Sequence, residues 1–249
     1  MNNREISVVV PCYKESAIIE ESISKLFSYL KEHFERFEII VVTDGSPDDT
    51  AEKVQAFGKQ HSDVPLKLIS FKKNCGKGAA VKEGVLSSQY SLVLFIDADL
   101  TVPIEELEKF LPSMETCDIA IASRLASGSF FEEKAPLYRT VLARGFHLLQ
   151  ILFLGNFEYS DTQCGFKLFK KVTAQKLFER SQIKRFAFDA EILFLARKMN
   201  ISVDVLPVTI KKDIRNTNVQ TLRDPLNMFF ALLKIRMNFW LGRYHLPKN

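Results

Sequence analysis

Two carboxylates lie where an apolar segment of the chain ends. Residues 94–96 are apolar, and Asp97 and Asp99 follow them with one alanine in between. In a strand, alternate side chains point to the same face, so the two carboxylates would lie about 7 Å apart on one side. Mg²⁺ and Mn²⁺ prefer oxygen ligands, commonly one or two carboxylates together with the phosphates of a substrate. The pair therefore predicts a cation site for a diphosphate or, equally well, a helix-capping aspartate beside a solvated one.

Acidic residues also follow two earlier apolar segments. Glu15 comes after residues 6–11, and Asp44 comes after residues 38–42. If these segments are parallel strands of one doubly wound sheet, their carboxyl ends meet at the edge where such sheets bind ligands. We therefore expect both residues to line the same site as the carboxylate pair.

Strand and helix patterns alternate through the first half of the chain, as a parallel sheet with helices on its faces requires. Apolar segments typical of buried strands are residues 6–11, 38–42, 66–71, 91–97 and 118–124. Amphipathic segments typical of helices lie between them, at residues 15–33, 50–60, 79–89 and 103–114. These patterns predict an α/β fold with a doubly wound, mostly parallel sheet.

The second half of the chain has a different pattern. We expect an apolar helix over about 135–154, a polar turn at 158–169, helices at 171–180 and 188–199, a strand pair within 202–211 and an amphipathic helix at 222–241. Because no repeat, low-complexity segment or linker separates the halves, we predict a single domain over residues 1–249.

Charge is distributed unevenly along the 249 residues, of which 47% are hydrophobic. Residues 1–124 contain 14 Lys and Arg against 20 Asp and Glu, whereas residues 125–249 contain 20 against 10. This asymmetry indicates metal or sugar binding in the first half and an anionic partner for the second, with uneven surface solvation as the alternative. Nucleic acid is not an expected partner, because the basic residues are interleaved with long apolar segments and no nucleic-acid-binding motif is present.

The cysteines and the apolar segments indicate where the protein works. Four widely spaced residues, Cys12, Cys75, Cys117 and Cys164, form no CxxC pair, which argues against a zinc site or a disulfide framework. The strand pattern begins within six residues of the first methionine, so we expect no secretory signal. No segment reaches the roughly 18 apolar residues of a membrane span. We therefore expect a cytoplasmic protein, in solution or at a membrane surface.

Several short motifs together resemble those of family 2 glycosyltransferases with the GT-A fold. In the first half they are residues 8–15 (VVVPCYKE), 43–50 (TDGSPDDT), 74–78 (NCGKG) and 97–99 (DAD). In the second half, residues 123–124 (SR), 161–169 (DTQCGFKLF) and 185–197 (RFAFDAEILFLAR) resemble the polyprenyl-phosphate branch, most nearly the dolichyl-phosphate β-glucosyltransferases and more distantly the mannosyltransferases. The resemblance implies an inverting, metal-dependent enzyme that moves a hexose, with glucose from UDP-glucose favoured, onto a polyprenyl phosphate.

The resemblance also implies a role for each residue that matches a family motif. The residues implied in the nucleotide pocket are Pro11, Tyr13, Glu15, Asp44 at the base, Lys77 near the diphosphate and Asp97 at the ribose or the cation. Asp99 would bind Mg²⁺ or Mn²⁺ on the diphosphate, and Asp161 would lie beside the reacting sugar with Gln163 close by. Residues 1–124 would thus bind the nucleotide sugar, and residues 125–249 would bind the acceptor and face a membrane.

Two features of the donor motifs leave alternatives open. The family commonly has two aspartates before Gly-Ser, whereas this chain has Thr43 in place of the first, so the choice between UDP and GDP is less firmly implied. The turn at residues 74–78 is not a P-loop, which needs four residues between its first glycine and the Gly-Lys pair. Gly76 and Gly78 could serve only a tight turn into a helix, so the contact of Lys77 with a diphosphate depends on the resemblance.

A phosphate acceptor needs cations rather than a general base. A phosphate monoester is mostly dianionic at neutral pH because its second pKa is about 6, and arginine binds phosphate oxygens through two parallel hydrogen bonds. Arg124 and Arg139 match the acceptor-phosphate positions that the resemblance implies, whereas Arg144 fits a surface charge better. Arg215 is a further candidate, although the Ser-Lys pair that often follows in the family is missing and a solvated loop charge is an equal alternative.

Other functions fit parts of the sequence. Asp189 and Glu191 could be the acid and base that a sugar hydroxyl acceptor, such as a growing polysaccharide, would require, or Asp189 could cap a helix. With a phosphate acceptor, we expect both to orient the acceptor-site arginines or the sugar. A module that binds a nucleotide sugar without turnover is a further alternative. The oligomeric state is not indicated.

Two amphipathic helices are predicted to touch a membrane. Their apolar residues are Leu142, Phe146, Leu149, Phe153, Phe229, Phe230, Leu233, Met237 and Trp240, and the flanking basic residues are Lys134, Arg139, Lys234, Arg236 and Arg243. Aromatic and basic amphipathic helices are typical of interfacial binding, although core packing accounts for part of each stripe. We expect peripheral attachment at the cytoplasmic face of a membrane.

Overall fold

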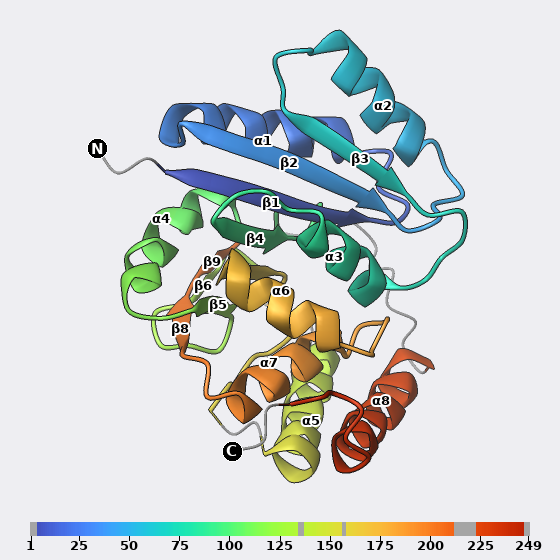
Figure 1. Cartoon of the computed structure of the whole chain (residues 1–249), viewed down its shortest axis with the longest axis vertical. Helices are drawn as coiled ribbons and strands as arrows, with labels where there is room; N and C mark the ends of the chain where they lie inside the picture. The colour runs from blue at the N-terminus through green and yellow to red at the C-terminus, as the bar shows by residue number, and fades with distance from the viewer. Residues whose placement is uncertain (1–3, 134–136, 156–157, 212–222, 247–249) are drawn as a thin grey trace.

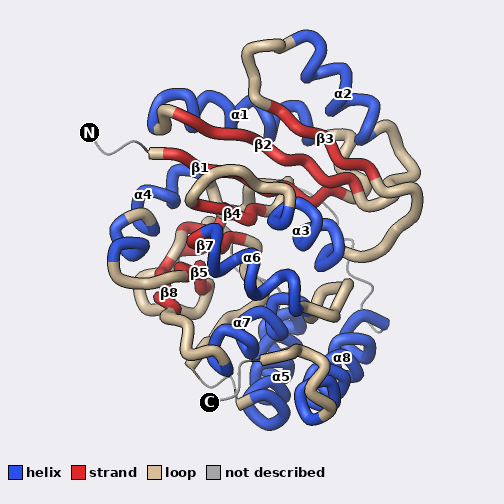
Figure 2. The backbone as a smooth tube through the Cα atoms, in the orientation of Figure 1, coloured by secondary structure: helices blue, strands red, loops and turns tan. Residues whose placement is uncertain are grey.

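A seven-stranded sheet forms the centre of the protein in the computed structural model, which describes residues 4–133, 137–155, 158–211 and 223–246 (Figures 1 and 2). The strands are β1 (Glu5–Cys12), β2 (Arg36–Thr43), β3 (Leu66–Ser70), β4 (Leu92–Ile96), β5 (Ile119–Ser123), β7 (Phe166–Lys170) and β8 (Val203–Pro207). Their order is β3-β2-β1-β4-β7-β5-β8, and every neighbouring pair is parallel except the two that include β7. The predicted α/β fold with a mostly parallel sheet is confirmed.

Helices cover both faces of this sheet (Figure 1). They are α1 (Ile19–His33), α2 (Thr50–Gln60), α3 (Lys77–Leu86), α4 (Leu107–Phe110), α5 (Leu137–Leu154), α6 (Lys171–Arg180), α7 (Phe188–Lys198) and α8 (Arg223–Trp240). Side chains of α1, α2 and α4 pack into the core on one face, and those of α3, α6 and α7 pack into the core on the other. None of the helices in the described part of the chain combines the length and hydropathy that a bilayer span needs.

Strand β7 corrects the polar turn expected at 158–169. Phe166 and Leu168 pack into one core and Phe169 packs into the other, which is the alternation of a strand buried on both faces. The polar residues just before this strand obscured the pattern in the sequence. Because β7 runs antiparallel to β4, with Phe166 opposite Ile96, residues 161–165 lie beside the carboxyl end of β4.

The helix expected at 103–114 is divided into three short pieces. A 3₁₀ helix at Ile104–Glu106 leads into α4, and a second 3₁₀ helix begins at Pro112 and ends at Glu115. Proline lacks a backbone N–H and its ring clashes with the preceding turn, so it interrupts the helical hydrogen bonds. The amphipathic pattern predicted a helix here correctly but overestimated its length.

The strand pair expected within 202–211 is two strands that belong to different sheets. β8 lies at the edge of the central sheet, parallel to β5. β9 (Thr209–Ile210) pairs instead with β6 (Phe130–Phe131) in a small second sheet. Pro207 ends β8 and has no backbone N–H for a ladder, which suits a strand at a sheet edge.

Candidate active site

Asp44 follows β2 and holds the turn at residues 74–78 in place. Its backbone N–H donates to the carbonyl of Cys12 at 2.9 Å, and its carboxylate accepts the backbone N–H groups of Cys75 (2.6 Å) and Gly76 (2.8 Å). Burial raises the pKa of this carboxyl group, and the two N–H groups oppose that shift. Asp44 therefore ties β1, β2 and the turn together, and its contact with a nucleotide base stays a prediction.

Thr43 is buried at the position where the motif would have a first aspartate. Its hydroxyl donates to Oγ of Ser70 at 2.9 Å and so joins β2 to β3. An aspartate here would place a second charge in the interior next to Asp44, and burying a charge is costly without a partner. The threonine avoids that cost and leaves the Asp44 contacts intact.

The loop after β1 is joined to the loop after β2. The backbone N–H groups of Lys14, Glu15 and Ser16 donate to Ser46 Oγ (2.7 Å), Thr50 Oγ1 (3.1 Å) and Asp48 Oδ2 (3.3 Å), respectively. Burial acts to raise the pKa of Asp48, but hydrogen bonds from Ser46 and Thr50 outweigh it and lower the pKa to about 2. In the structure its carboxylate fixes the loop that carries Tyr13 and Glu15, whose side chains are partly exposed beyond the buried Pro11.

Asp97 and Asp99 follow β4, as expected. The backbone N–H of Asp97 donates to the carbonyl of Gly165 at 3.0 Å. The carboxylate of Asp97 lies so close to Gly165 that a β-carbon there would come within 1.9 Å of Oδ2, so only glycine fits. Asp97 Oδ1 also lies 2.6 Å from Nζ of Lys77. Asp99 Oδ1 accepts hydrogen bonds from the backbone N–H and the hydroxyl of Thr101, both at 3.0 Å.

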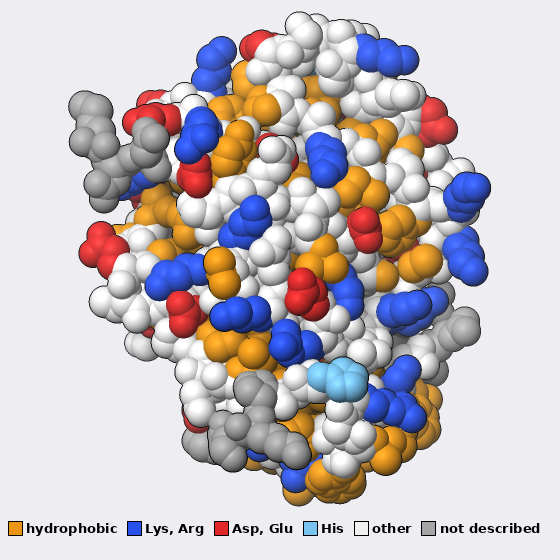
Figure 3. Space-filling model, viewed as in Figure 1, with side chains coloured by type: hydrophobic (Ala, Val, Ile, Leu, Met, Phe, Trp, Pro, Cys, Tyr) orange, Lys and Arg blue, Asp and Glu red, His pale blue; other side chains and the backbone are white. Residues whose placement is uncertain are grey.

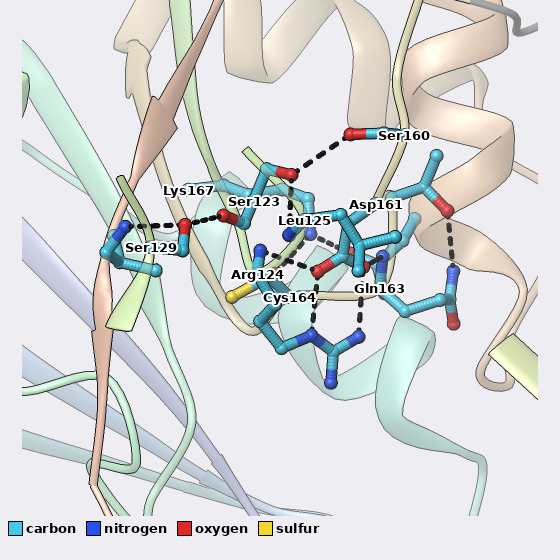
Figure 4. Close-up of polar contacts among 12 residues, drawn as sticks. Ser123, Arg124, Leu125, Ser129, Ser160, Asp161, Gln163, Cys164 and Lys167 are labelled. Atoms are coloured by element: carbon cyan, nitrogen blue, oxygen red, sulfur yellow. Dashed lines mark hydrogen bonds and ion pairs between the residues drawn. The ribbon is translucent and has the colours of Figure 1, made fainter. Parts of the chain in front are cut away.

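Arg124 and Asp161 form a bidentate ion pair where β5 ends (Figure 4). Nε and Nη2 of Arg124 donate to Oδ2 (2.7 Å) and Oδ1 (2.9 Å), and the backbone N–H of Arg124 donates to Oδ2 at 3.0 Å. The backbone N–H of Gln163 adds a bond to Oδ1 at 3.1 Å. Burial acts to raise the pKa of Asp161, but Arg124 outweighs it and lowers the pKa below its ordinary value. Asp161 therefore orients Arg124, and the predicted place of Asp161 and Gln163 beside a sugar stays a prediction.

Comparison with known proteins identifies the family. Residues 7–178 match the family model described as glycosyl transferase family 2. The chain belongs to this family.

Relatives named dolichyl-phosphate beta-glucosyltransferase are similar to this glycosyltransferase over most of its length. The relative from Dictyostelium discoideum is 32% identical over 255 residues, which cover 97% of this chain and 77% of the relative. The relative from Homo sapiens is 31% identical over 258 residues, which cover 99% of this chain and 79% of the relative. One from Trichomonas vaginalis is 39% identical over 212 residues, but only 62% of its length is covered.

Solved structures share the fold of this glycosyltransferase at lower identity. Mannosyl-3-phosphoglycerate synthase from Rubrobacter xylanophilus aligns with a TM-score of 0.67 at 18% identity, over 98% of this chain and 77% of that structure. Glucosyl-3-phosphoglycerate synthase from Mycobacterium tuberculosis, in complex with Mn²⁺ and UDP-glucose, aligns with a TM-score of 0.62 at 20% identity, over 99% of this chain and 81% of that structure. These likenesses support the GT-A fold.

The carboxylates after β4 of the glycosyltransferase fit a hard divalent cation in ligand type. Asp97 and Asp99 offer only oxygen, as Mg²⁺ and Mn²⁺ prefer. Within the described residues, no group of three or more His, Cys, Asp or Glu side chains gathers to hold a metal ion. The two carboxylates would therefore need further oxygens from a diphosphate, which is the usual arrangement for Mg²⁺ in phosphate-transfer sites.

Asp189 is buried in an ion pair with Lys167. Helix α7 begins at Phe188 after an N-cap at Ala187, so Asp189 is not the helix cap. Its Oδ1 accepts a hydrogen bond from Nζ of Lys167 at 2.5 Å, and the two side chains are only 4% and 2% exposed. The sequence missed this pair, although a lysine within the apolar segment that forms β7 was a signal that a buried partner must exist.

Glu191 holds a loop and the C-terminal segment. Its carboxylate accepts the backbone N–H groups of Gln182 and Ile183, at 3.0 and 2.9 Å, and the hydroxyl of Tyr244 at 2.7 Å. The expectation that Asp189 and Glu191 orient the acceptor-site arginines is wrong for Arg124, whose carboxylate partner is Asp161, and their orientation of the sugar stays a prediction. Both carboxylates are buried and engaged by these protein contacts.

The side chains of two of the three predicted acceptor arginines lie outside the described part of the structure. Arg139 belongs to α5, but its side chain is not described, and Arg215 lies outside the described residues. Arg144, on the same helix, is exposed, in agreement with a surface charge. Of the three predicted acceptor arginines, Arg124 is the one whose side-chain contacts the structure describes.

Proposed function

We propose that this glycosyltransferase moves glucose from UDP-glucose onto the phosphate of a polyprenyl carrier such as dolichyl phosphate, with inversion at the anomeric carbon. The observation that carries the proposal is that the side chains of Asp189 and Glu191 are buried and bound, whereas the Arg124 side chain is 39% exposed. A phosphate dianion needs a cation and no base, whereas a sugar hydroxyl needs a base. The relatives named dolichyl-phosphate beta-glucosyltransferase support the same sugar and acceptor.

Features of residues 1–124 support UDP-glucose as the donor and a divalent cation as the cofactor. A structural neighbour in complex with Mn²⁺ and UDP-glucose shares the fold that carries Asp97 and Asp99. Mg²⁺ or Mn²⁺ held by these carboxylates would neutralise the negative charge that UDP gains as it leaves. Pro11 near the end of β1, and Tyr13 and Glu15 on the loop that follows it, would line the nucleotide pocket.

Transfer would be a single displacement. An oxygen of the acceptor phosphate attacks the anomeric carbon, the bond from that carbon to the β-phosphate oxygen breaks, and UDP leaves with the bonding electrons. Arg124, oriented by Asp161, would bind the acceptor phosphate, because its side chain is 39% exposed. Because the attacking oxygen carries no proton at neutral pH, no side chain has to remove one.

Glucolipid synthesis tests the proposal directly. Purified protein with UDP-glucose, Mn²⁺ and a short, water-soluble polyprenyl phosphate is expected to form polyprenyl phosphate glucose, measured by mass spectrometry. GDP-glucose in place of UDP-glucose should give at least about tenfold less product, since a pocket that hydrogen-bonds one base rejects others strongly. Transfer to an oligosaccharide but not to the polyprenyl phosphate would contradict the acceptor assignment.

We also propose that one face of the molecule, formed by α5 and α8, binds the membrane that contains the lipid acceptor. Exposed apolar side chains on this α5–α8 face are Leu148 (65%), Leu152 (73%), Leu226 (61%), Phe230 (63%), Met237 (47%) and Trp240 (71%). Hydrophobic side chains gather at this end of the molecule with Lys and Arg among them (Figure 3). Arg236 lies 5.0 Å from the ring of Trp240, and Lys234 and Arg243 are exposed nearby in the chain. Basic residues beside an apolar face favour anionic lipid.

The α5–α8 face differs in detail from the one predicted. Phe146, Leu149 and Phe153 pack against the core instead, and Phe153 meets Phe229 edge to face with ring centres 5.7 Å apart. Leu148 and Leu152 replace them at the surface. The side chain of Leu142 and residue Lys134 lie outside the described part of the structure. We place the bound protein at the cytoplasmic face, as the cysteine spacing predicts.

Vesicle binding tests the α5–α8 face. Replacing both Phe230 and Trp240 by Ala is expected to lower the partition coefficient onto vesicles containing anionic lipid by at least about a hundredfold, because each buried aromatic contributes about 1.5–3 kcal/mol and tenfold corresponds to about 1.4 kcal/mol. Co-sedimentation with the vesicles measures this partition coefficient. The control is Val172→Ala, which changes a side chain that is 62% exposed on α6. Equal binding of the double variant and the wild type would contradict the assignment.

A further inference from the structure

Lys77 forms an ion pair with Asp97, one of the two carboxylates of the candidate cation site. It is the first residue of α3, and its Nζ lies 2.6 Å from Asp97 Oδ1 and 5.3 Å from the centre of the Phe95 ring. The contact places a positive charge on an oxygen that a divalent cation would need. A dication and this ammonium cannot both lie against the same carboxylate oxygen without strong repulsion.

A second, more deeply buried ion pair lies near Lys77. Nζ of Lys167 is 2.5 Å from Asp189 Oδ1, 2.6 Å from the carbonyl of Cys164 and 5.5 Å from the centre of the same Phe95 ring. Asp189 also attracts Lys77 electrostatically. The four side chains therefore alternate in charge, from Asp97 at the site to Lys167 in the core.

This arrangement keeps Lys77 charged and close to the site. The carboxylates of Asp97 and Asp189 both attract the Lys77 ammonium group. The side chain is 24% exposed, so an anion that enters the site can reach it. A diphosphate carries several negative charges and offers both Lys77 and the dication a replacement partner.

We propose that Lys77 is a place-holder cation. Its ammonium group neutralises Asp97 in the nucleotide-free enzyme, and a divalent cation replaces it at Asp97 only when a nucleotide diphosphate binds. The inference depends on the cation site of the proposed function. It predicts that the metal ion and the nucleotide bind together, each strengthening the other by the same factor. The exchange gives Lys77 the diphosphate as its new partner, so the same side chain opposes binding of the metal ion without nucleotide and then helps to bind the donor.

Metal binding without turnover tests the inference. The dissociation constant of Mn²⁺, measured by electron paramagnetic resonance with and without UDP, is expected to be weak for the wild type alone and at least tenfold tighter with UDP. Lys77→Met removes the charge but keeps an unbranched apolar stem against Phe95. We expect this variant to bind Mn²⁺ alone about tenfold tighter than the wild type does, because a neighbouring positive charge is gone. UDP should strengthen Mn²⁺ binding by a smaller factor in the variant than in the wild type, because only the ligand oxygens of the diphosphate then contribute.

Two further variants complete the comparison. Lys72→Met removes an exposed lysine five residues earlier and should leave Mn²⁺ binding unchanged. Lys77→Arg keeps the charge and should behave as the wild type within about threefold. If Lys77→Met binds Mn²⁺ alone no better than the wild type, while both bind Mn²⁺ with UDP, the place-holder role is wrong. If no protein binds Mn²⁺ even with UDP, the proposed cation site fails, and the inference fails with it.

Discussion

Asp99→Asn is expected to lower the rate of glucose transfer by about a thousandfold. The substitution removes a negative charge that we assign to the divalent cation at the point where UDP leaves, and stabilisation of charge there contributes several kcal/mol. The local structure should survive, because the asparagine Oδ1 can accept the same two hydrogen bonds from Thr101 that Asp99 accepts at 3.0 Å. The initial rate at saturating UDP-glucose and Mn²⁺ is the measurement.

The control for this prediction is a charge-removing change at a remote surface position. Asp63→Asn alters an exposed side chain whose ion pair with Lys31 is long, at 3.8 Å, and should retain full activity. Thermal unfolding of both variants checks that they fold. Full turnover by Asp99→Asn, or undiminished activity of the wild type after chelation of divalent cations, would show that the carboxylates after β4 do not hold a catalytic cation.

The donor half was predictable because its signals are local. Each apolar segment of the first half became a strand, and parallel pairing of β1 with β2 and β4 brings the carboxyl ends of these strands to one edge. Asp44 and Asp97 follow those ends and therefore had to lie at that edge. The motif around Asp44 did not reveal that its carboxylate also holds the turn at residues 74–78, because backbone donors leave no mark in a sequence.

The acceptor half was less predictable because its decisive contacts join residues far apart in the chain. Arg124 and Asp161 are separated by 37 residues, and no spacing rule links them. Strand β7 was hidden because polar residues precede it and because it enters the sheet against the direction of its neighbours. Lys167 and Asp189 did carry a signal, since each is a charged residue in an apolar segment and buried charges require partners. That signal predicts a partner but not its identity.

Arg124→Ala is expected to lower kcat/KM for polyprenyl phosphate by about a hundredfold or more, mainly through a higher KM. Hydrogen bonds between an arginine and a phosphate contribute up to about 3 kcal/mol each, and tenfold corresponds to about 1.4 kcal/mol. Affinity for UDP should stay within about threefold, since Arg124 lies at the end of β5 rather than on the donor loops. Steady-state kinetics with varied acceptor and calorimetry with UDP measure the two effects. Arg144→Ala, at an exposed position of α5, is the matched control and should change neither.

A double-mutant cycle separates the two roles that Asp161 could have. If Asp161 acts by orienting Arg124, as its bonds of 2.7 and 2.9 Å to the guanidinium indicate, then Asp161→Asn should cost nothing further once Arg124 is Ala. If Asp161 instead contacts the reacting sugar, the two losses should multiply. Asp161→Asn alone leaves an arginine without its buried carboxylate partner, so we expect a lower unfolding temperature for this variant. Its kinetics should therefore be measured well below that temperature. We expect the double variant to match Arg124→Ala within about threefold in kcat/KM. A further hundredfold loss would instead show that Asp161 contacts the reacting sugar.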